Sequence, residues 1–167
     1  MTLNQQKLFL FLDNLGIQTE TTEHEPVHTV DDNRNLRANL NNRHQAAAHI
    51  KNLFLKDKKG KLWLIIAHEH KKIDLKELRH DIGAAHLSFG KPEVLHDILG
   101  VVPGSVTPFA LIHDHNHQVN VVIDHALIES PAINCHPLTN SATTLIATKD
   151  LLHFIAALGF QLQILEA

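Results

Sequence analysis

Apolar residues return at helical spacing near the start of the chain. Leu8, Leu12 and Leu15 lie three or four residues apart, and a capping box precedes them at Thr2 to Gln5. Gly16 follows the last of them, and glycine is the usual residue just past the end of a helix. This pattern predicts an amphipathic N-terminal helix.

Caps, prolines and glycines further along the chain predict four more helices. A cap at Thr29 or Asp31 begins the first of them, which runs through Leu40. The other three are expected from Asp74 to Gly83, from Pro92 to Leu99 and from Lys149 to Leu158. Gly100 and Gly159 follow the last two and provide their stops.

Short apolar or alternating runs between these helices predict strands. They cover residues 17–23, 51–56, 62–67, 87–89, 106–113, 119–124, 145–148 and 162–165. We expect Lys58-Lys59-Gly60 to form the turn of a hairpin between the second and third runs. We also expect a polar turn to connect 106–113 with 119–124 as a paired hairpin. Strands and helices mix without strict alternation. The sequence therefore predicts an α+β fold, a single compact domain over residues 1–167 with a central mixed, largely antiparallel sheet flanked by helices.

Composition narrows the class of protein. The chain has 167 residues, 44% of them hydrophobic and 20% charged, and no apolar run approaches the ~20 residues of a membrane span. The segment from Met1 to Leu12 carries one lysine and no small-residue cleavage site, so we expect no signal peptide. The one cysteine, Cys135, fits a reducing compartment. We expect a soluble, cytoplasmic protein.

Charge is unevenly distributed along the chain. The formal net charge of −3 argues against a protein that coats nucleic acid through bulk electrostatics. Between Lys51 and Arg79, however, nine of the fifteen Lys and Arg residues stand against four acids, a local excess of five positive charges. A basic patch and a solvated hairpin turn both explain this segment.

Metal and nucleophile motifs are weak in this sequence. Its fifteen histidines include His68-Glu69-His70 and His113 to His117, but no third ligand, Cys-x-x-Cys or His-Glu-x-x-His accompanies them. Gly-x-Ser-x-Gly is absent, and Cys135 and His136 are adjacent in extended chain, where neighbours point to opposite faces. We expect no metal, no cofactor and a buried bystander cysteine.

Three other features fit a site that binds and polarises a substrate. Lys51 opens an apolar strand, where a charge is costly unless it reaches a partner such as phosphate. Gly104 begins a Gly-Ser-Val-Thr-Pro loop whose amides could converge on a developing oxyanion. His136 precedes Pro137 and is therefore held extended. A surface lysine, an ordinary turn and an uninvolved histidine are the alternatives.

Four sequence blocks, in this order and spacing, resemble the YbaK/prolyl-tRNA editing family. They are Lys51 to Asp57, Leu87 to Gly90, Leu99 to Leu111 and His136 to Asn140. The likeness extends from His24-x-Pro26-Val27 to the closing Asp150 to Phe154 helix, and it is strongest to the free-standing ProX or PrdX deacylases of alanyl-tRNA(Pro).

The resemblance implies hydrolysis of the ester that joins alanine to a proline tRNA. It implies a positioned water assisted by the ribose hydroxyl, without a covalent intermediate, metal or cofactor. Lys51, Gly104 and His136 would carry the reaction, with Lys51 on the phosphate of the terminal adenosine. The remaining implied contacts are Asn52, Ser105, Val106, Thr107, Pro108 and Asn140 to the substrate, and Lys56, Lys58, Lys59 and Arg79 to the tRNA.

Three positions depart from the family pattern: Ile50, His28 and the segment Ala84-Ala85-His86. They affect the size of the pocket or the contacts with the tRNA, and they leave the expected reaction class unchanged. The alternatives are a deacylase for another mischarged tRNA, such as cysteinyl-tRNA(Pro), and a non-catalytic module that binds tRNA or prolyl-tRNA synthetase. A metal-dependent hydrolase is a third alternative, which would lose its activity when a chelator is added.

Overall fold

One eight-stranded sheet organises the computed structural model, which describes residues 1–26 and 47–166. The strands follow the order β1-β7-β6-β2-β3-β5-β8, and β4 pairs with β2 off this path. Their bounds are β1 Thr19–Glu23, β2 Ala47–Asp57, β3 Leu62–His68, β4 Leu87–Phe89, β5 Val119–Asp124, β6 Ala132–Cys135, β7 Ala142–Ala147 and β8 Leu162–Leu165. The α+β prediction is confirmed.

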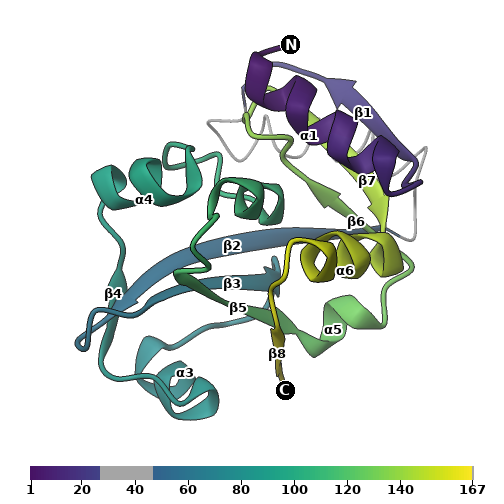
Figure 1. Cartoon of the computed structure of the whole chain (residues 1–167). Coiled ribbons are helices and arrows are strands. Elements are labelled where there is room, and N and C mark those ends of the chain that lie inside the picture. The colour runs from purple at the N-terminus through teal and green to yellow at the C-terminus, as the bar shows by residue number, and fades with distance from the viewer. Residues whose placement is uncertain (27–46, 167) are drawn as a thin grey trace.

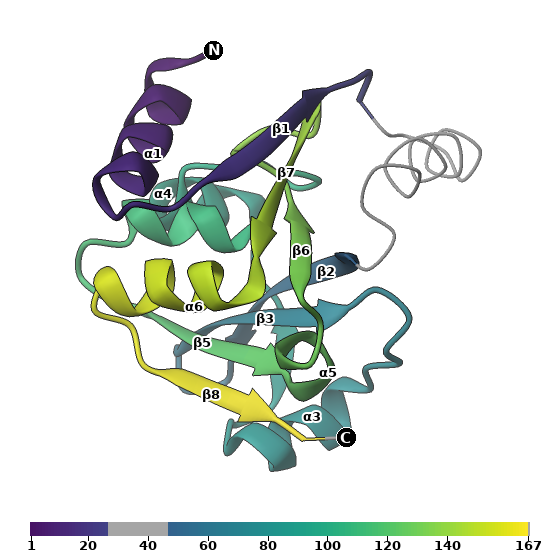
Figure 2. The same ribbon diagram turned by 90° about the vertical axis from the view of Figure 1, so that its right-hand side faces the viewer.

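Helices cover both faces of this sheet. They are α1 Leu3–Asn14, α3 Leu75–Ile82, α4 Pro92–Leu99, the 3-10 helix η1 Pro108–His113, α5 His125–Ile128 and α6 Thr148–Ala157. Figures 1 and 2 show α1, α4 and α6 on one side of the layer formed by β2, β3 and β5, and α3 on the other. Within residues 1–26 and 47–166, no helix has the length and apolar character of a membrane span.

The predicted caps set the helix ends. Thr2 and Gln5 form both hydrogen bonds of the capping box at α1. The Asp74 carboxylate accepts a hydrogen bond from the Lys76 amide, 2.8 Å away, and Gly83 ends α3 with a φ of 75°. That left-handed conformation favours glycine, and it confirms the predicted stop. The predicted helix from Thr29 or Asp31 to Leu40 and the departure at His28 lie outside the described residues.

The predicted strand 106–113 is wrong. Residues Pro108–His113 form η1, and β5 pairs in parallel with β3 and β8 instead of closing a hairpin. The Thr107 hydroxyl caps η1 by accepting from the Phe109 amide, 3.3 Å away, and Pro108 suits the first turn because it has no N–H to satisfy. Phe109 and its two successors are all buried, a pattern that a buried turn of helix shares with a buried strand.

The sheet is mixed. Its antiparallel pairs are β1–β7, β2–β3, β2–β4 and β6–β7, and its parallel pairs are β2–β6, β3–β5 and β5–β8. The predicted hairpin of β2 and β3 is present, with Leu55 opposite Trp63. Alternate residues of β2 enter two cores. Phe54 packs in the larger core with η1, and Leu55 packs in the smaller core with α3.

Candidate active site

Strand β2 changes partner along one of its edges. On that edge β6 pairs with residues 47–49 and β4 pairs with residues 55–57. The Gly90 amide donates to the Phe54 carbonyl at 2.9 Å, and the Lys58 amide donates to His86 at 2.9 Å, so even-numbered residues of β2 face this edge. Asn52 therefore directs its backbone N–H and C=O into the interval between β6 and β4.

The structure places Lys51 and Asn52 on opposite faces of β2, as consecutive strand residues must be. The Lys51 ammonium donates a hydrogen bond to the carbonyl of Lys71, in the connection between β3 and α3. Asn52 shares its face with Ile50 and Phe54, which pack in the larger core. The two predicted site residues thus flank the interval between β6 and β4 from its two sides.

Two carboxamide oxygens near this interval lack partners. The Oδ1 atoms of Asn52 and Asn134 are buried, and no described residue donates a hydrogen bond to either. Asn134 lies in β6, opposite His49 of β2. A buried acceptor without a partner is rare in native proteins and loses about 1–3 kcal/mol of solvation. Such an atom is a candidate contact for the donor group of a ligand.

The loop from Gly104 to Pro108 lies on the Asn52 face and leads into η1. Gly104 has a φ of 92°, and Ser105 and Thr107 are buried. The Ser105 amide donates to the Val102 carbonyl at 3.0 Å, whereas the amides of Gly104, Val106 and Thr107 donate to no described residue. Three backbone donors in this short turn therefore lack a partner among residues 1–26 and 47–166, and donors of this kind can bind an anion or a polarised carbonyl.

His136 follows β6, at the point where β6 and β2 separate. The last pair between these strands is His49 with Asn134, so Lys51 and His136 each lie two residues beyond it. The imidazole Nδ1 is 3.3 Å from the Ala142 carbonyl oxygen. Burial lowers the pKa of His136 below its usual 6.5, and the charge of His24 lowers this pKa further. The hydrogen bond to the Ala142 carbonyl acts in the opposite direction and raises the pKa. The ring is therefore predominantly neutral at pH 7.

A hollow of about 910 Å³ opens beside the segment that follows His136. The N-terminal turn of α1, strand β1 and the β6–β7 connection line it, with His24, Thr139 and Ser141 among its polar side chains. The Thr139 and Ser141 hydroxyls are 3.0 Å apart, and half-buried Asn140 lies between them in sequence. This segment holds Asn140 near the predicted histidine.

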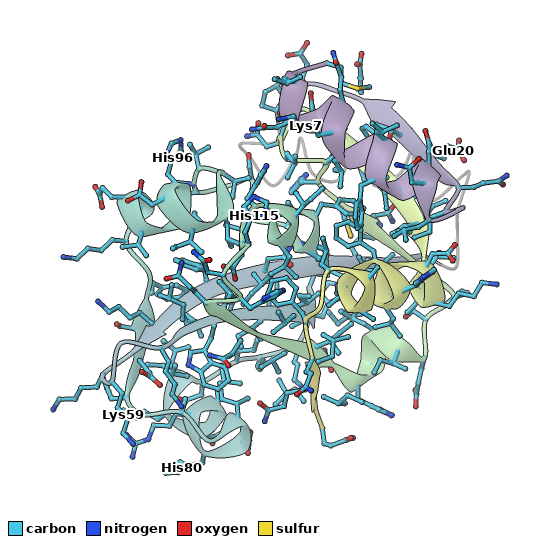
Figure 3. All side chains as sticks on the ribbon, in the orientation of Figure 1. Lys7, Glu20, Lys59, His80, His96 and His115 are labelled. Carbon is cyan, nitrogen blue, oxygen red and sulfur yellow. The ribbon has the colours of Figure 1, made fainter. Side chains whose placement is uncertain are left out.

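Three of the four predicted tRNA-contacting residues share one groove. Lys56, Lys58 and Arg79 line it, together with Lys91, which the sequence did not single out. Lys59 does not line it and lies at the outer end of the β2–β3 hairpin (Figure 3). Part of the local excess of positive charge therefore lines a surface groove, and part of it lies on the hairpin turn.

A buried carboxylate supports the floor of this groove. Asp57 accepts hydrogen bonds from the backbone amides of Lys59, Lys61 and Ala85, at 3.0, 2.9 and 3.3 Å. These bonds fix the hairpin turn to the segment that approaches β4. The same groove presents Phe89, which is 65% exposed and offers an aromatic face among the cations.

The prediction that Cys135 is buried is confirmed. Its side chain is buried in the larger core, on the face of β6 opposite to Asn134. Burial strongly raises the pKa of the thiol, so it stays protonated at physiological pH and is a poor nucleophile. Burial and protonation both argue against Cys135 as a nucleophile.

The histidine clusters of the sequence have structural partners. His113 donates from Nδ1 to the Leu99 carbonyl at 2.8 Å, and His117 is 2.7 Å from the Leu158 carbonyl. His70 lies 3.2 Å from the Glu69 carboxylate. In residues 1–26 and 47–166, no three His, Cys, Asp or Glu side chains are grouped as metal ligands.

Comparison with known proteins assigns the fold to a family. The family described as the aminoacyl-tRNA editing domain matches residues 24–154, which include every candidate site residue above. The chain belongs to the aminoacyl-tRNA editing domain family. This membership confirms the resemblance found in the sequence and the expectation of an aminoacyl-tRNA deacylase.

Curated relatives of this editing domain span most of its length. It is 34% identical to the "Prolyl-tRNA editing protein ProX" of Acetoanaerobium sticklandii, over 97% of this chain and 96% of that protein. It is 37% identical to the "Prolyl-tRNA synthetase associated domain-containing protein 1" of Danio rerio, over 90% and 80% of the two chains. A solved structure described as a candidate trans-editing enzyme for prolyl tRNA synthetase shares the fold, with a TM-score of 0.71 at 19% identity, over 100% and 99% of the two chains.

Two residues of the editing domain next to the predicted site were missed by the sequence reasoning, one in contact with Lys51 and one behind it. Lys71 accepts the hydrogen bond of Lys51, and Asp124 lies 3.7 Å from the Lys71 ammonium. Asp124 is more than fifty residues from Lys71 in sequence, and no local pattern relates the two. Only the parallel pairing of β3 with β5 brings them together.

The lowered pKa of His136 gives a first prediction. Nuclear magnetic resonance should show the His136 ring titrating below 6.5 in the folded protein and near 6.5 in urea, because burial penalises the imidazolium. The folded state then loses stability as the pH falls from the unfolded pKa toward the folded one, since the unfolded chain binds the proton more readily. A folded-state titration midpoint above 6.5 would contradict this environment.

Proposed function

We propose that this editing domain hydrolyses alanyl-tRNA(Pro) in trans. The sequence identity to a protein named for prolyl-tRNA editing supports the tRNA, and the motif blocks support alanine. The observation that carries the proposal is the Gly104 to Pro108 loop, in which three amides have no partner among the described residues and which lies on the face of β2 that also bears Asn52. This arrangement suits an ester carbonyl that becomes an oxyanion during hydrolysis.

The need for such an enzyme follows from the limits of amino-acid recognition. A pocket that accepts proline binds a slightly smaller side chain only about 1–3 kcal/mol less tightly, so a synthetase makes errors. A second site that admits alanine and excludes proline removes those errors by hydrolysis. Ile50, half-buried in the larger core beside Asn52, contributes apolar volume that restricts the space next to this strand.

The reaction we propose uses water as the nucleophile. The amides of Gly104, Val106 and Thr107 hold the carbonyl oxygen as negative charge develops on it. Ser105 and Pro108 fix the loop from within, since both are buried. The ribose hydroxyl next to the ester assists the proton transfers, so no covalent enzyme intermediate forms.

The terminal nucleotide would cross the open edge of β2. In this arrangement its phosphate meets the Lys51 ammonium on one face, and its aminoacyl group reaches Asn52 and the loop on the other. Neutral His136, level with Lys51, and Asn140 close the end of the site near β6. A neutral imidazole can accept a hydrogen bond as well as donate one, which suits contact with a ribose hydroxyl.

The basic groove would guide the rest of the acceptor end. Lys56, Lys58 and Arg79 are placed to contact phosphates, and Lys59 extends the same charge to the hairpin tip. Local charge of this kind attracts one tRNA end to a protein whose net charge is −3. The mischarged tRNA is released by prolyl-tRNA synthetase, which makes that enzyme a candidate partner in the cytoplasm.

Replacement of Lys51 by alanine tests the site. We expect Lys51→Ala to lower kcat/KM for alanyl-tRNA(Pro) by about 10- to 100-fold, as the loss of one charge-assisted hydrogen bond predicts. Lys7→Ala, at an exposed lysine of α1, is the control and should be silent. Unchanged hydrolysis by Lys51→Ala would remove Lys51 from the site, and no hydrolysis by the parent protein would favour a binding module.

Replacement of Gly104 by alanine tests the loop. A methyl group at Gly104 meets no atom within 4 Å, but the φ of 92° becomes strained by about 1–2 kcal/mol, which disturbs the amides on either side. Gly16→Ala is a matched control, with a φ of 73° and equally open surroundings. Both variants should lose similar stability in urea, and only Gly104→Ala should lose kcat. An equal kcat in the two variants would contradict a catalytic role for the loop.

A further inference from the structure

A chain of contacts connects Lys51 to a buried carboxylate on another strand. The Lys51 ammonium donates to the Lys71 carbonyl, and the Lys71 ammonium lies 3.7 Å from Oδ1 of Asp124. The Asp124 side chain is only 3% exposed and that of Lys71 is 23% exposed, so this ion pair is shielded from water. Lys71 thus contacts Lys51, the predicted phosphate-binding residue, through its backbone carbonyl, and it contacts the Asp124 carboxylate through its side chain.

Both ends of this chain are held in place. Asp124 accepts hydrogen bonds from the backbone amides of His68 and Ala126, each at 3.1 Å, so its carboxylate is fixed between the end of β3 and the start of α5. The Lys71 amide donates to the His68 carbonyl at 3.0 Å, which closes a turn after β3. The position of the Lys71 carbonyl is therefore determined by two attachments to the sheet.

A lysine used to bind phosphate needs such support. Its ammonium is a compact charge on a flexible four-carbon stem, and ordering that stem costs conformational entropy. The ammonium has three protons, so a hydrogen bond to Lys71 leaves two for a phosphate. A fixed carbonyl on one side of the ammonium restricts the directions in which the other two protons point.

We propose that Lys71 and Asp124 are positioning residues that hold Lys51 in its phosphate-binding place. The inference rests on the proposed function, because it concerns the lysine of the same site. Neither residue contacts the reacting atoms. They act through the carbonyl of Lys71, which the ion pair with Asp124 keeps directed at Lys51.

A double-mutant cycle tests the proposal. Lys71→Met keeps the backbone carbonyl and removes the ammonium, and we expect it to raise KM for alanyl-tRNA(Pro) by about 3- to 10-fold with a smaller effect on kcat. In a Lys51→Ala background the same change should have no further effect, because the residue that it positions is gone. Lys71→Arg retains the ion pair and should keep KM within about twofold of the parent value.

Two further variants separate positioning from folding. Lys71→Met leaves the Asp124 carboxylate without its cation, so the pair Lys71→Met with Asp124→Asn is measured as well. That pair removes both charges, keeps an oxygen that caps α5 and gives up the hydrogen bond from the His68 amide, so it should lose some stability in urea but remain folded while KM stays raised. Lys72→Met, at the exposed neighbouring lysine, is the matched control and should be silent.

The outcomes are distinguishable. Equal effects of Lys71→Met in the parent and in Lys51→Ala would show that Lys71 acts on the tRNA directly, and the proposal would be overturned. A parent-like KM in the uncharged pair would overturn it too. If Lys51→Ala has no effect on hydrolysis, the proposed function of the site fails. If Lys51→Ala lowers hydrolysis but Lys71→Met leaves KM unchanged, only the positioning proposal is overturned.

Discussion

The exchange of partners along one edge of β2 is the constraint on which the site depends. Strand β2 pairs with β6 at its start and with β4 at its end, while β3 runs along its other edge throughout. The backbone of Asn52 faces the interval between those partners. Every candidate group is placed relative to that interval: Lys51 on one face, Asn52 and the Gly104 loop on the other, and His136 beyond the last β6 pair.

The charge distribution suits the proposed tRNA substrate of a protein with an excess of acids. Positive charge is concentrated where the β2–β3 hairpin and α3 form a groove, and Asp57 organises its floor through backbone hydrogen bonds. The Asn52 face is largely apolar, with loop amides as its available donors. A basic groove at the β4 end of β2 and loop amides beside Asn52 are compatible with deacylation without a protein nucleophile.

Local signals predicted much of the fold. The capping box at Thr2, the cap at Asp74 and the stop at Gly83 are determined by adjacent residues, and the structure agrees with each. Pairing between distant strands left no such signal. The apolar run after Pro108 therefore looked like a strand although it forms η1, and the contact of Lys71 with Asp124 could not be foreseen. The motif blocks supplied the candidate site residues, but not the arrangement of Lys51 and Asn52 on opposite faces of β2.

The most direct test of this account is the rate at which the purified protein hydrolyses alanyl-tRNA(Pro), cysteinyl-tRNA(Pro) and prolyl-tRNA(Pro), each measured with and without chelator. The account predicts that alanine is released fastest, that prolyl-tRNA(Pro) is spared and that chelator has no effect. Fastest release of cysteine or proline would contradict the alanine specificity, loss of activity with chelator would contradict the proposed mechanism, and no hydrolysis of any of the three would contradict the catalytic function itself.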